Sequence, residues 1–506
     1  MDEAVRERPA LRAHHHLWRD ILKYIPSVLL PRMTGIITVP IITSLFRPEL
    51  YGAYALVLAN VAVLNSAALT GMGSSLLRFL PEYEGDSEGE SRLLSTIFTL
   101  ALGICAAVVV IGAAVVLAAM RDSEGGFARL MLIGLGLFVA NGVFSLVAQV
   151  LRSARRAGMY STIQLVSGYG GLAFGLLLVI VFKVGIQGLL IGSIVAALLG
   201  IALGWRVAMR GRTVRLGGFS PGILRHVIRY AFFVSIGNAA YWLLSYSDRW
   251  ILQLNHGTHA VGLYAVGFDI TGRTTMLFVS TFALALQPIS ISTWESSGRE
   301  ATERFLSAST RLYLLVMLPA TVGLSLIAKR LVDLLAAPAY APAAVVVPFV
   351  AFAMLLFGLL DIAGRGLTLS KRPDIEARNF FLAGLTSVAS NLLLIPRYGI
   401  IAAAFSSLLG YAVLFTLHVI SARPFARWRF PWPNFLRIAG ACAAMSVVVL
   451  GIESQLGGWN RFAVLGTAIA AGALTYGASI LALREITPAQ LRELAFRAPA
   501  PPEREP

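Results

Sequence analysis

The sequence predicts an all-α polytopic membrane protein with about 14 transmembrane helices, arranged as two pseudo-symmetric six-helix bundles followed by two C-terminal helices. Three observations predict this fold. Apolar stretches of roughly 20 residues follow one another from Lys23 to Leu483, and each can cross a hydrocarbon core about 30 Å thick. Of the 506 residues 57% are hydrophobic and only 13% are charged, which excludes an ordinary soluble domain. Segments of the first half also recur in the second half.

The lengths of the apolar stretches place the spans to within a few residues. They are expected at about 23–45, 51–79, 93–119, 128–151, 159–182, 186–208, 227–252, 260–291, 305–328, 342–369, 376–395, 399–421, 434–452 and 461–483. The expected domains, in chain order, are an N-terminal tail (1–22), a first six-helix bundle (23–208), a basic linker (209–226), a second six-helix bundle (227–421), two added helices (422–486) and a C-terminal tail (487–506). The first tail has no apolar core with a cleavage site, so no removable signal peptide is expected.

The distribution of Lys and Arg predicts the orientation in the membrane. With the N-terminus inside, the internal segments hold about 31 of the 42 Lys and Arg residues, whereas the external side keeps mostly single cations such as Arg47 and Lys183. Both termini are therefore expected in the cytoplasm. The acidic segment 82–90 departs from the pattern, but acidic residues weigh little in this rule. The net charge of +16 reflects this topology, and no nucleic-acid partner is expected.

The chain repeats itself at an almost constant spacing, and this predicts the two bundles. Three pairs of segments match at offsets of 210, 214 and 216 residues: Tyr51-Gly-Ala-Tyr-Ala55 with Val261-Gly-Leu-Tyr-Ala265, Phe182-Lys-Val-Gly-Ile186 with Pro396-Arg-Tyr-Gly-Ile400, and Ala154-Arg-Arg156 with Ser370-Lys-Arg372. An even number of spans per repeat gives both bundles one orientation, and parallel repeats of this kind place a substrate path between the bundles. Chance matching of short Gly-Tyr motifs is the alternative.

Two arginines lie deep inside apolar segments. Arg32 is about 14 Å from the inner end of the first span, and Arg273 lies at a comparable depth in the eighth. An ionised side chain there costs about 3 to over 10 kcal/mol, so these residues predict a water-filled interior that binds anions. The planar guanidinium group of arginine can donate two parallel hydrogen bonds to two oxygens of one phosphate. The alternative is an arginine that reaches the interface or neutralises a carboxylate.

Carboxylates stand near the buried cations. Asp269 precedes Arg273 by one helical turn, and Asp361 and Arg365 show the same spacing in the tenth span. In the functional interpretation this is a charge relay, in which the carboxylate holds the arginine until substrate phosphate displaces it or a proton arrives. Simple mutual neutralisation is the other interpretation.

The seventh span combines polar, aromatic and charged residues. Trp242 lies at about mid-membrane, where its indole needs a hydrogen-bond partner, and Asn238 and Tyr241 on the same span are further candidates for binding substrate. Trp242 either stacks on sugar faces in a wet cavity or packs between helices. The adjacent Asp248 and Arg249 point differently around the helix, so they are expected to pair with other segments or to form an external gate.

The sequence carries no motif for catalysis. It contains no Walker motif for ATP, no Gly-Lys-Ser/Thr run, and no His/Glu cluster with metal-ligand spacing. Cys105 and Cys442 both lie in apolar runs and are expected to be buried free thiols. We therefore expect a protein that is not an enzyme, with no cofactor, metal or disulfide.

Four motifs resemble the polysaccharide biosynthesis proteins of bacteria, the Wzx-type flippases within the multidrug/oligosaccharidyl-lipid/polysaccharide exporter superfamily. The motifs are Glu49-Leu-Tyr-Gly-Ala-Tyr-Ala-Leu56, Leu76-Leu-Arg-Phe-Leu-Pro-Glu82, Ser247-Asp-Arg-Trp-Ile-Leu252 and Val261-Gly-Leu-Tyr-Ala265. The resemblance implies a V-shaped pair of bundles around a central cavity that works by alternating access. Related flippases carry cavity arginines on the first, second and eighth helices, and Arg32, Arg78 and Arg273 are similar by position.

The resemblance also implies a function. It is the transfer of a polyprenyl-pyrophosphate oligosaccharide from the cytoplasmic to the periplasmic leaflet of the bacterial inner membrane, for O-antigen or exopolysaccharide. Membrane lipids, a polymerase and glycosyltransferases are the implied partners. An ion-coupled multidrug or metabolite antiporter of the same superfamily is the first alternative, but its cationic substrates favour carboxylates in the cleft. A non-transporting scaffold is the second, and it needs no charges at mid-membrane.

Overall fold

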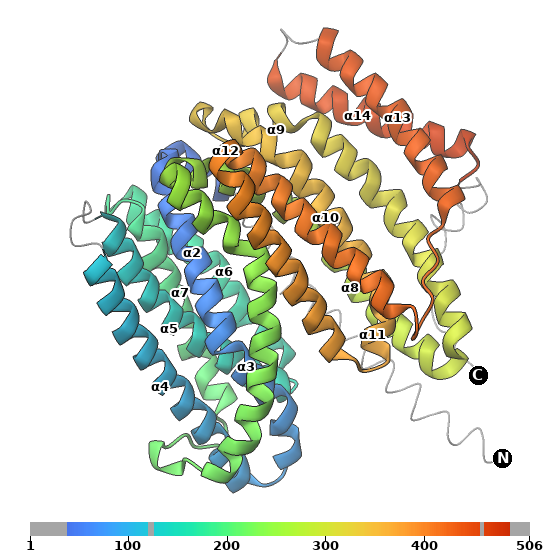
Figure 1. Cartoon of the computed structure of the whole chain (residues 1–506). Helices are drawn as coiled ribbons and strands as arrows, with labels where there is room; N and C mark the ends of the chain where they lie inside the picture. The colour runs from blue at the N-terminus through green and yellow to red at the C-terminus, as the bar shows by residue number, and fades with distance from the viewer. Residues whose placement is uncertain (1–37, 120–125, 456–459, 486–506) are drawn as a thin grey trace, which may run out of the picture. The chain divides into compact units, whose positions relative to one another are not determined.

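The computed structural model describes residues 38–119, 126–455 and 460–485, and in these ranges every regular element is a helix. The predicted all-α polytopic fold is therefore confirmed (Figure 1). The long helices are α2 (Pro48–Ala68), α3 (Thr70–Phe79), α4 (Ser87–Ala119), α5 (Gly126–Ser153), α6 (Ala157–Ile180), α7 (Gln187–Ala208), α8 (Pro221–Leu326), α10 (Val346–Ala363), α12 (Pro373–Ala422), α13 (Trp432–Gln455) and α14 (Arg461–Ala482). The short helices are η1 (Leu80–Tyr83), η2 (Leu216–Gly218), α9 (Ala328–Leu335), η3 (Pro338–Val345) and α11 (Arg365–Leu369).

Across the described ranges, ten helices are long and apolar enough to cross a membrane, and the two longest are broken by glycines with positive φ. In α8 these are Gly257 (φ +75°) and Gly298 (φ +76°), and in α12 it is Gly399 (φ +56°). A right-handed helix needs φ near −63°, so each glycine ends one helical segment and starts the next. The first, second and third segments of α8 thus match the predicted seventh, eighth and ninth spans, and α12 holds the eleventh and twelfth.

The backbone supports the internal repeat. Arg155 and Lys371, which occupy equivalent places in the repeat, both adopt left-handed conformations, with φ of +53° and +56°. Residues other than glycine seldom do so. Gly185 and Gly399 are also equivalent, and both have positive φ. The same unusual turns therefore recur at the predicted offsets.

Contacts between helices group the chain into two compact units. Unit 1 holds the described residues of Met1–Asp269 and Ala377–Gly410, and unit 2 holds those of Ile270–Glu376 and Tyr411–Pro506. These units follow packing, whereas the predicted bundles at 23–208 and 227–421 follow the repeat, and the bundle organisation stays a prediction. The first segment of α8 belongs to unit 1.

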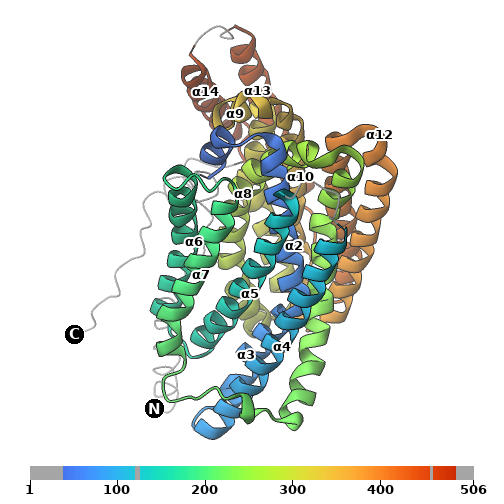
Figure 2. The same ribbon diagram turned by 90° about the vertical axis from the view of Figure 1, so that its left-hand side faces the viewer.

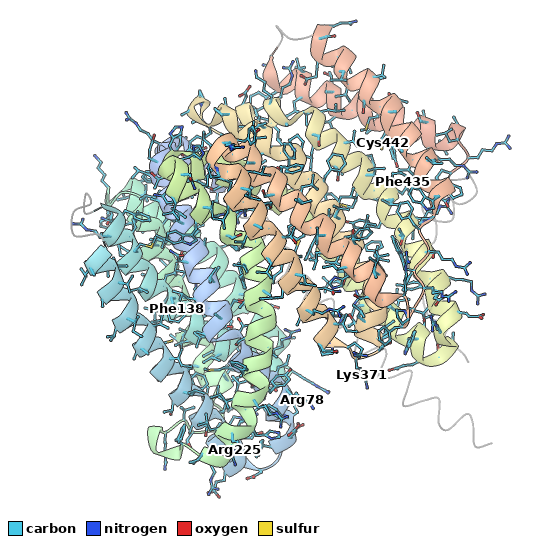
Figure 3. The ribbon with its side chains drawn as sticks, viewed as in Figure 1. Arg78, Phe138, Arg225, Lys371, Phe435 and Cys442 are labelled. Atoms are coloured by element: carbon cyan, nitrogen blue, oxygen red, sulfur yellow. The ribbon has the colours of Figure 1, made fainter. Side chains whose placement is uncertain are left out.

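Unit 1 is built around closely packed helices α5, α6 and α7, which run side by side (Figure 2). A side chain at Gly192 of α7 would overlap the backbone at Gly175 of α6, so glycine lets these two helices approach closely. Phe138 of α5 is fully buried in the same unit (Figure 3).

The predicted basic linker 209–226 is tied to the start of α4. Arg212 Nε lies 2.5 Å from Glu90 Oε2, and the Arg215 amide donates to Ser95 Oγ at 3.0 Å. Glu90 belongs to the acidic segment that departs from the charge pattern. Its partner in the linker explains how a carboxylate is accommodated on a face rich in cations.

In unit 2, ion pairs connect the helix pair α13–α14 to neighbouring helices at both ends of the pair. Glu485, whose side chain is fully buried, lies 2.5 Å from Arg311 Nε of the third α8 segment and 3.4 Å from Arg437 Nη1 of α13. At the opposite end of α13, Arg330 Nε of α9 lies 2.5 Å from Glu453 Oε1. The two helices added after the repeat are therefore integral to unit 2.

Candidate functional site

A buried ion pair lies in the first segment of α8. The side chains of Asp248 and Arg249 are only 1% and 5% exposed, and Arg249 Nη1 lies 3.3 Å from Asp248 Oδ1. Arg249 Nη1 also donates to the Ser245 carbonyl at 3.0 Å. A paired charge of this kind tolerates burial, whereas either partner alone would be costly.

Two other helical segments complete this centre. Tyr264, on the second segment of α8, donates its hydroxyl to Asp248 Oδ2. Ser407 of α12 donates to the same oxygen at 3.1 Å. Asp248 therefore joins three segments of unit 1 through hydrogen bonds, but its ion-pair partner is the adjacent Arg249, which was expected to point elsewhere around the helix. Its gating role stays a prediction.

Aromatic rings extend from this centre along one face of α8. The Trp242 and Tyr246 rings are tilted by 31° to each other with centroids 4.7 Å apart, and the Arg249 guanidinium lies 4.6 Å from the Tyr246 ring and 4.8 Å from the Phe268 ring. Positions 242, 246 and 249 share a face because they are spaced by four and three residues. Cation–π attraction adds to the pairing of the buried arginine.

The predicted sugar-binding residues lie on the same segment. Tyr241 contacts both Trp242 and Phe380 of α12 edge-to-face, with centroids 5.6 and 5.9 Å apart. Asn238 Nδ2 donates to the Val234 carbonyl at 2.8 Å. These contacts agree with packing between helices, and both aromatic residues stay half-buried rather than enclosed. A role in binding sugar stays a prediction.

The three arginines that resemble cavity residues have different surroundings. Arg32 lies outside the described residues. Arg78 is exposed near the end of α3, 5.8 Å from the Phe79 ring, at the same end of unit 1 as Arg225 (Figure 3). Arg273 is half-buried on the second segment of α8, in unit 2. The substrate roles of all three remain predictions.

The carboxylates predicted to assist the arginines have protein partners. Asp269 accepts a hydrogen bond from the Tyr51 hydroxyl at 2.8 Å. In unit 2, Arg365 Nη2 lies 2.6 Å from Asp361 Oδ2, so the i, i+4 spacing does bring these two side chains together. The pairing of Asp269 with Arg273, and the relay roles of both pairs, stay predictions.

Unit 2 also contains an apolar cavity that the sequence did not indicate. Its volume is about 420 Å³, and it lies between two segments of α8, α13 and α14. Phe278, Leu324, Met445, Ile469 and Tyr476 contribute to its lining. Volumes of about 300–1,000 Å³ are usual for sites that bind small molecules. The lining suits hydrocarbon rather than a charged group.

Comparison with known families decides the classification. Residues 17–294 match the family described as "Polysaccharide biosynthesis protein", and this range exceeds half of the chain. The chain belongs to this family. The resemblance indicated by the sequence motifs is thereby confirmed.

Two relatives align with more than two thirds of this chain. The probable low-salt glycan biosynthesis flippase Agl15 of Haloferax volcanii is 24% identical over 357 residues, which are 70% of this chain and 72% of Agl15. The uncharacterized membrane protein MJ1068 of Methanocaldococcus jannaschii is 21% identical over 368 residues, covering 69% of this chain and 72% of that protein.

Solved structures share the fold. The lipid II flippase MurJ in an inward closed conformation has a TM-score of 0.75 and 16% identity, covering 92% of this chain and 99% of MurJ. An inward-facing multidrug resistance MATE family transporter of the MOP superfamily has a TM-score of 0.66 and 13% identity, covering 78% and 94% of the two chains. This polysaccharide biosynthesis protein therefore has the fold seen in MurJ and MATE transporters.

Proposed function

We propose that the protein is a flippase that moves a polyprenyl-pyrophosphate-linked oligosaccharide from the cytoplasmic to the periplasmic leaflet by alternating access. The observation that carries this proposal is the apolar cavity of about 420 Å³, because a hydrocarbon chain needs a dry, uncharged site within the protein. Family membership and the similarity to the glycan flippase Agl15 support a lipid-linked glycan as the substrate. The product would feed O-antigen or exopolysaccharide assembly.

The pairing of the carboxylates with other side chains favours a lipid-linked glycan over a cationic substrate. Asp248 is held by Arg249, Asp361 by Arg365, and Asp269 accepts a hydrogen bond from Tyr51. A multidrug antiporter needs carboxylates that can bind cationic substrates or coupling ions. In this protein a side chain already binds each of these three carboxylates, so a cation would have to displace it. A scaffold without transport would have no use for such buried charges, which are costly to keep.

The proposed location is the inner membrane of a bacterium, with both termini in the cytoplasm. The excess of Lys and Arg in alternate connections supports this orientation. A polysaccharide polymerase and glycosyltransferases are the proposed partners, since they would consume and produce the lipid-linked oligosaccharide. Transport, rather than catalysis, is the proposed activity.

The membrane potential is expected to drive transfer. A pyrophosphate diester carries about two negative charges, so its export from a negative interior gains roughly 4–5 kcal/mol per 100 mV if the charges cross the whole field. In proteoliposomes, a potential of this sign should accelerate transfer of a fluorescent polyprenyl-pyrophosphate glycan without a pH or sodium gradient. Transfer that ignores the potential but requires a proton or sodium gradient would instead support the antiporter.

Filling the apolar cavity should slow transfer. Gly323 lines the cavity, and a Cβ at this position would meet no atom within 4 Å. Gly323→Leu should therefore occupy the cavity without disturbing the helix, and Gly323→Ala is the matched control. We expect transfer to fall about tenfold or more in the leucine variant, because each buried CH₂ of a lipid tail contributes about 0.8 kcal/mol. Equal rates in both variants would show that the tail does not enter this cavity.

A further inference from the structure

The start of α2 touches the start of the second α8 segment through their backbones. A Cβ added at Gly52 would overlap the Thr258 carbonyl oxygen, and a Cβ added at Gly262 would overlap that of Pro48. Only glycine permits such a close approach. The contacting residues of both helices belong to unit 1, and Gly257 with φ +75° provides the turn that starts the second α8 segment here.

The contact is symmetric under the internal repeat. Thr258 follows Pro48 by 210 residues and Gly262 follows Gly52 by 210, the offset at which the motifs of these two helices match. Each glycine thus faces the residue four positions before the other glycine. Equivalent elements of the two repeats meet here around a local twofold axis.

A histidine and a carboxylate join the same two helix ends, and their positions obey the same symmetry. His259 Nδ1 lies 2.7 Å from Glu49 Oε1, and residue 259 is again 210 positions after residue 49. Both side chains are about half exposed, at 53% and 52%. The nearest other charged group along the chain is Arg47, and His256 donates its Nε2 to the Ile395 carbonyl at 2.8 Å.

The position of this pair in the membrane follows from the charge pattern. Arg47 and Lys183 belong to the connections predicted to be external, so the contact between the two helix starts lies on the external face. A carrier that works by alternating access must separate elements of its two repeats on one face and then on the other. A contact between equivalent repeat elements at the external face is suited to that motion.

We propose that the Glu49–His259 pair is a latch that holds the external ends of α2 and the second α8 segment together, while Gly52 and Gly262 provide the closed packing. This inference rests on the proposed transport function and on the predicted orientation. Opening to the outside breaks the pair and separates the two glycine surfaces. A pair of exposed side chains such as Glu49 and His259 interacts weakly, so the latch shifts the balance between closed and open states by a few fold rather than locking it.

A buried reporter on the second α8 segment tests the latch. Ala265, which is 1% exposed, is replaced by cysteine, and its reaction with a membrane-impermeant maleimide is followed from the external side. The native thiols of Cys105 and Cys442 are buried, so the chain without Ala265→Cys gives a low background. Adding Glu49→Gln or His259→Gln should raise the labelling rate by up to about fivefold. Exchanging the pair, with Glu49→His and His259→Glu together, should restore the original rate.

A second variant tests the packing independently of charge. Gly52→Ala should give the fastest labelling, since its methyl group prevents closure, whereas Gly103→Ala, with no atom within 4 Å of the added Cβ, should change nothing. Unchanged labelling in the Glu49, His259 and Gly52 variants overturns the proposal, as does an exchange variant that labels as fast as the single ones. Reaction from the cytoplasmic side alone overturns the external assignment. The labelling experiment needs no substrate. Labelling rates that support the latch, together with an absence of measurable glycan transfer, would therefore refute the proposed function alone.

Discussion

Replacement of Asp248 by alanine is expected to destabilise the folded protein by about 3–5 kcal/mol, because it leaves the Arg249 guanidinium buried without its carboxylate. Tyr264 and Ser407 would lose their common acceptor at the same time. Thermal unfolding of the purified protein in detergent measures the loss.

A compensating variant separates this charge effect from general damage. Asp248→Leu combined with Arg249→Met removes both charges, and it should be more stable than Asp248→Ala, since apolar residues can replace a buried ion pair. Asp374→Ala is the surface control, because Asp374 and its partner Arg372 are well exposed. If Asp248→Ala unfolds at the wild-type temperature, the buried pair does not hold the three helical segments together.

Arg273→Ala is expected to reduce glycan transfer about 10- to 100-fold while the protein remains folded and inserted. The reason is the loss of charge-assisted hydrogen bonds to the pyrophosphate, worth about 1.5–3 kcal/mol. Lysine should rescue only in part, because it lacks the paired donors of the guanidinium. Complementation of a flippase-null strain, together with membrane abundance, measures the effect.

Two further variants make this result specific. Arg32→Ala should behave like Arg273→Ala if both arginines bind the phosphates. Arg78→Ala should have a smaller effect, because Arg78 is exposed near the end of α3. Full activity of both Arg273→Ala and Arg32→Ala would refute an anion-binding cavity.

The sequence predicted the helices well because each span must be apolar over its whole length. The predicted span at 260–291 begins three residues after the break at Gly257, and the span at 399–421 begins at the break at Gly399 itself. The short motifs at Arg155 and Lys371 identified turns whose unusual conformations the structure then showed. Local sequence was sufficient for these features, since hydropathy and turn geometry depend on neighbouring residues.

The surroundings of the candidate site could not be read in the same way. Tyr264 and Ser407 bind Asp248 from 16 and 159 residues away, and neither carries a local signal for that role. Arg78 matched a cavity residue by position, but position along a helix does not determine which side faces solvent. The apolar cavity was missed because its lining residues are ordinary for membrane helices.

The two left-handed turns at Arg155 and Lys371 reveal a conflict between backbone preference and charge. A left-handed conformation costs a residue with a side chain roughly 1–2 kcal/mol, and glycine would avoid that cost. Both turns nevertheless carry a cation on the side predicted to be cytoplasmic. Lys183, in a connection predicted to be external, also adopts a left-handed conformation, with φ of +52°, so the strained cations are not confined to one side. The strain at Arg155 and Lys371 is therefore a property that equivalent turns of the two halves share, and the charge that these turns carry does not by itself set the orientation in the membrane.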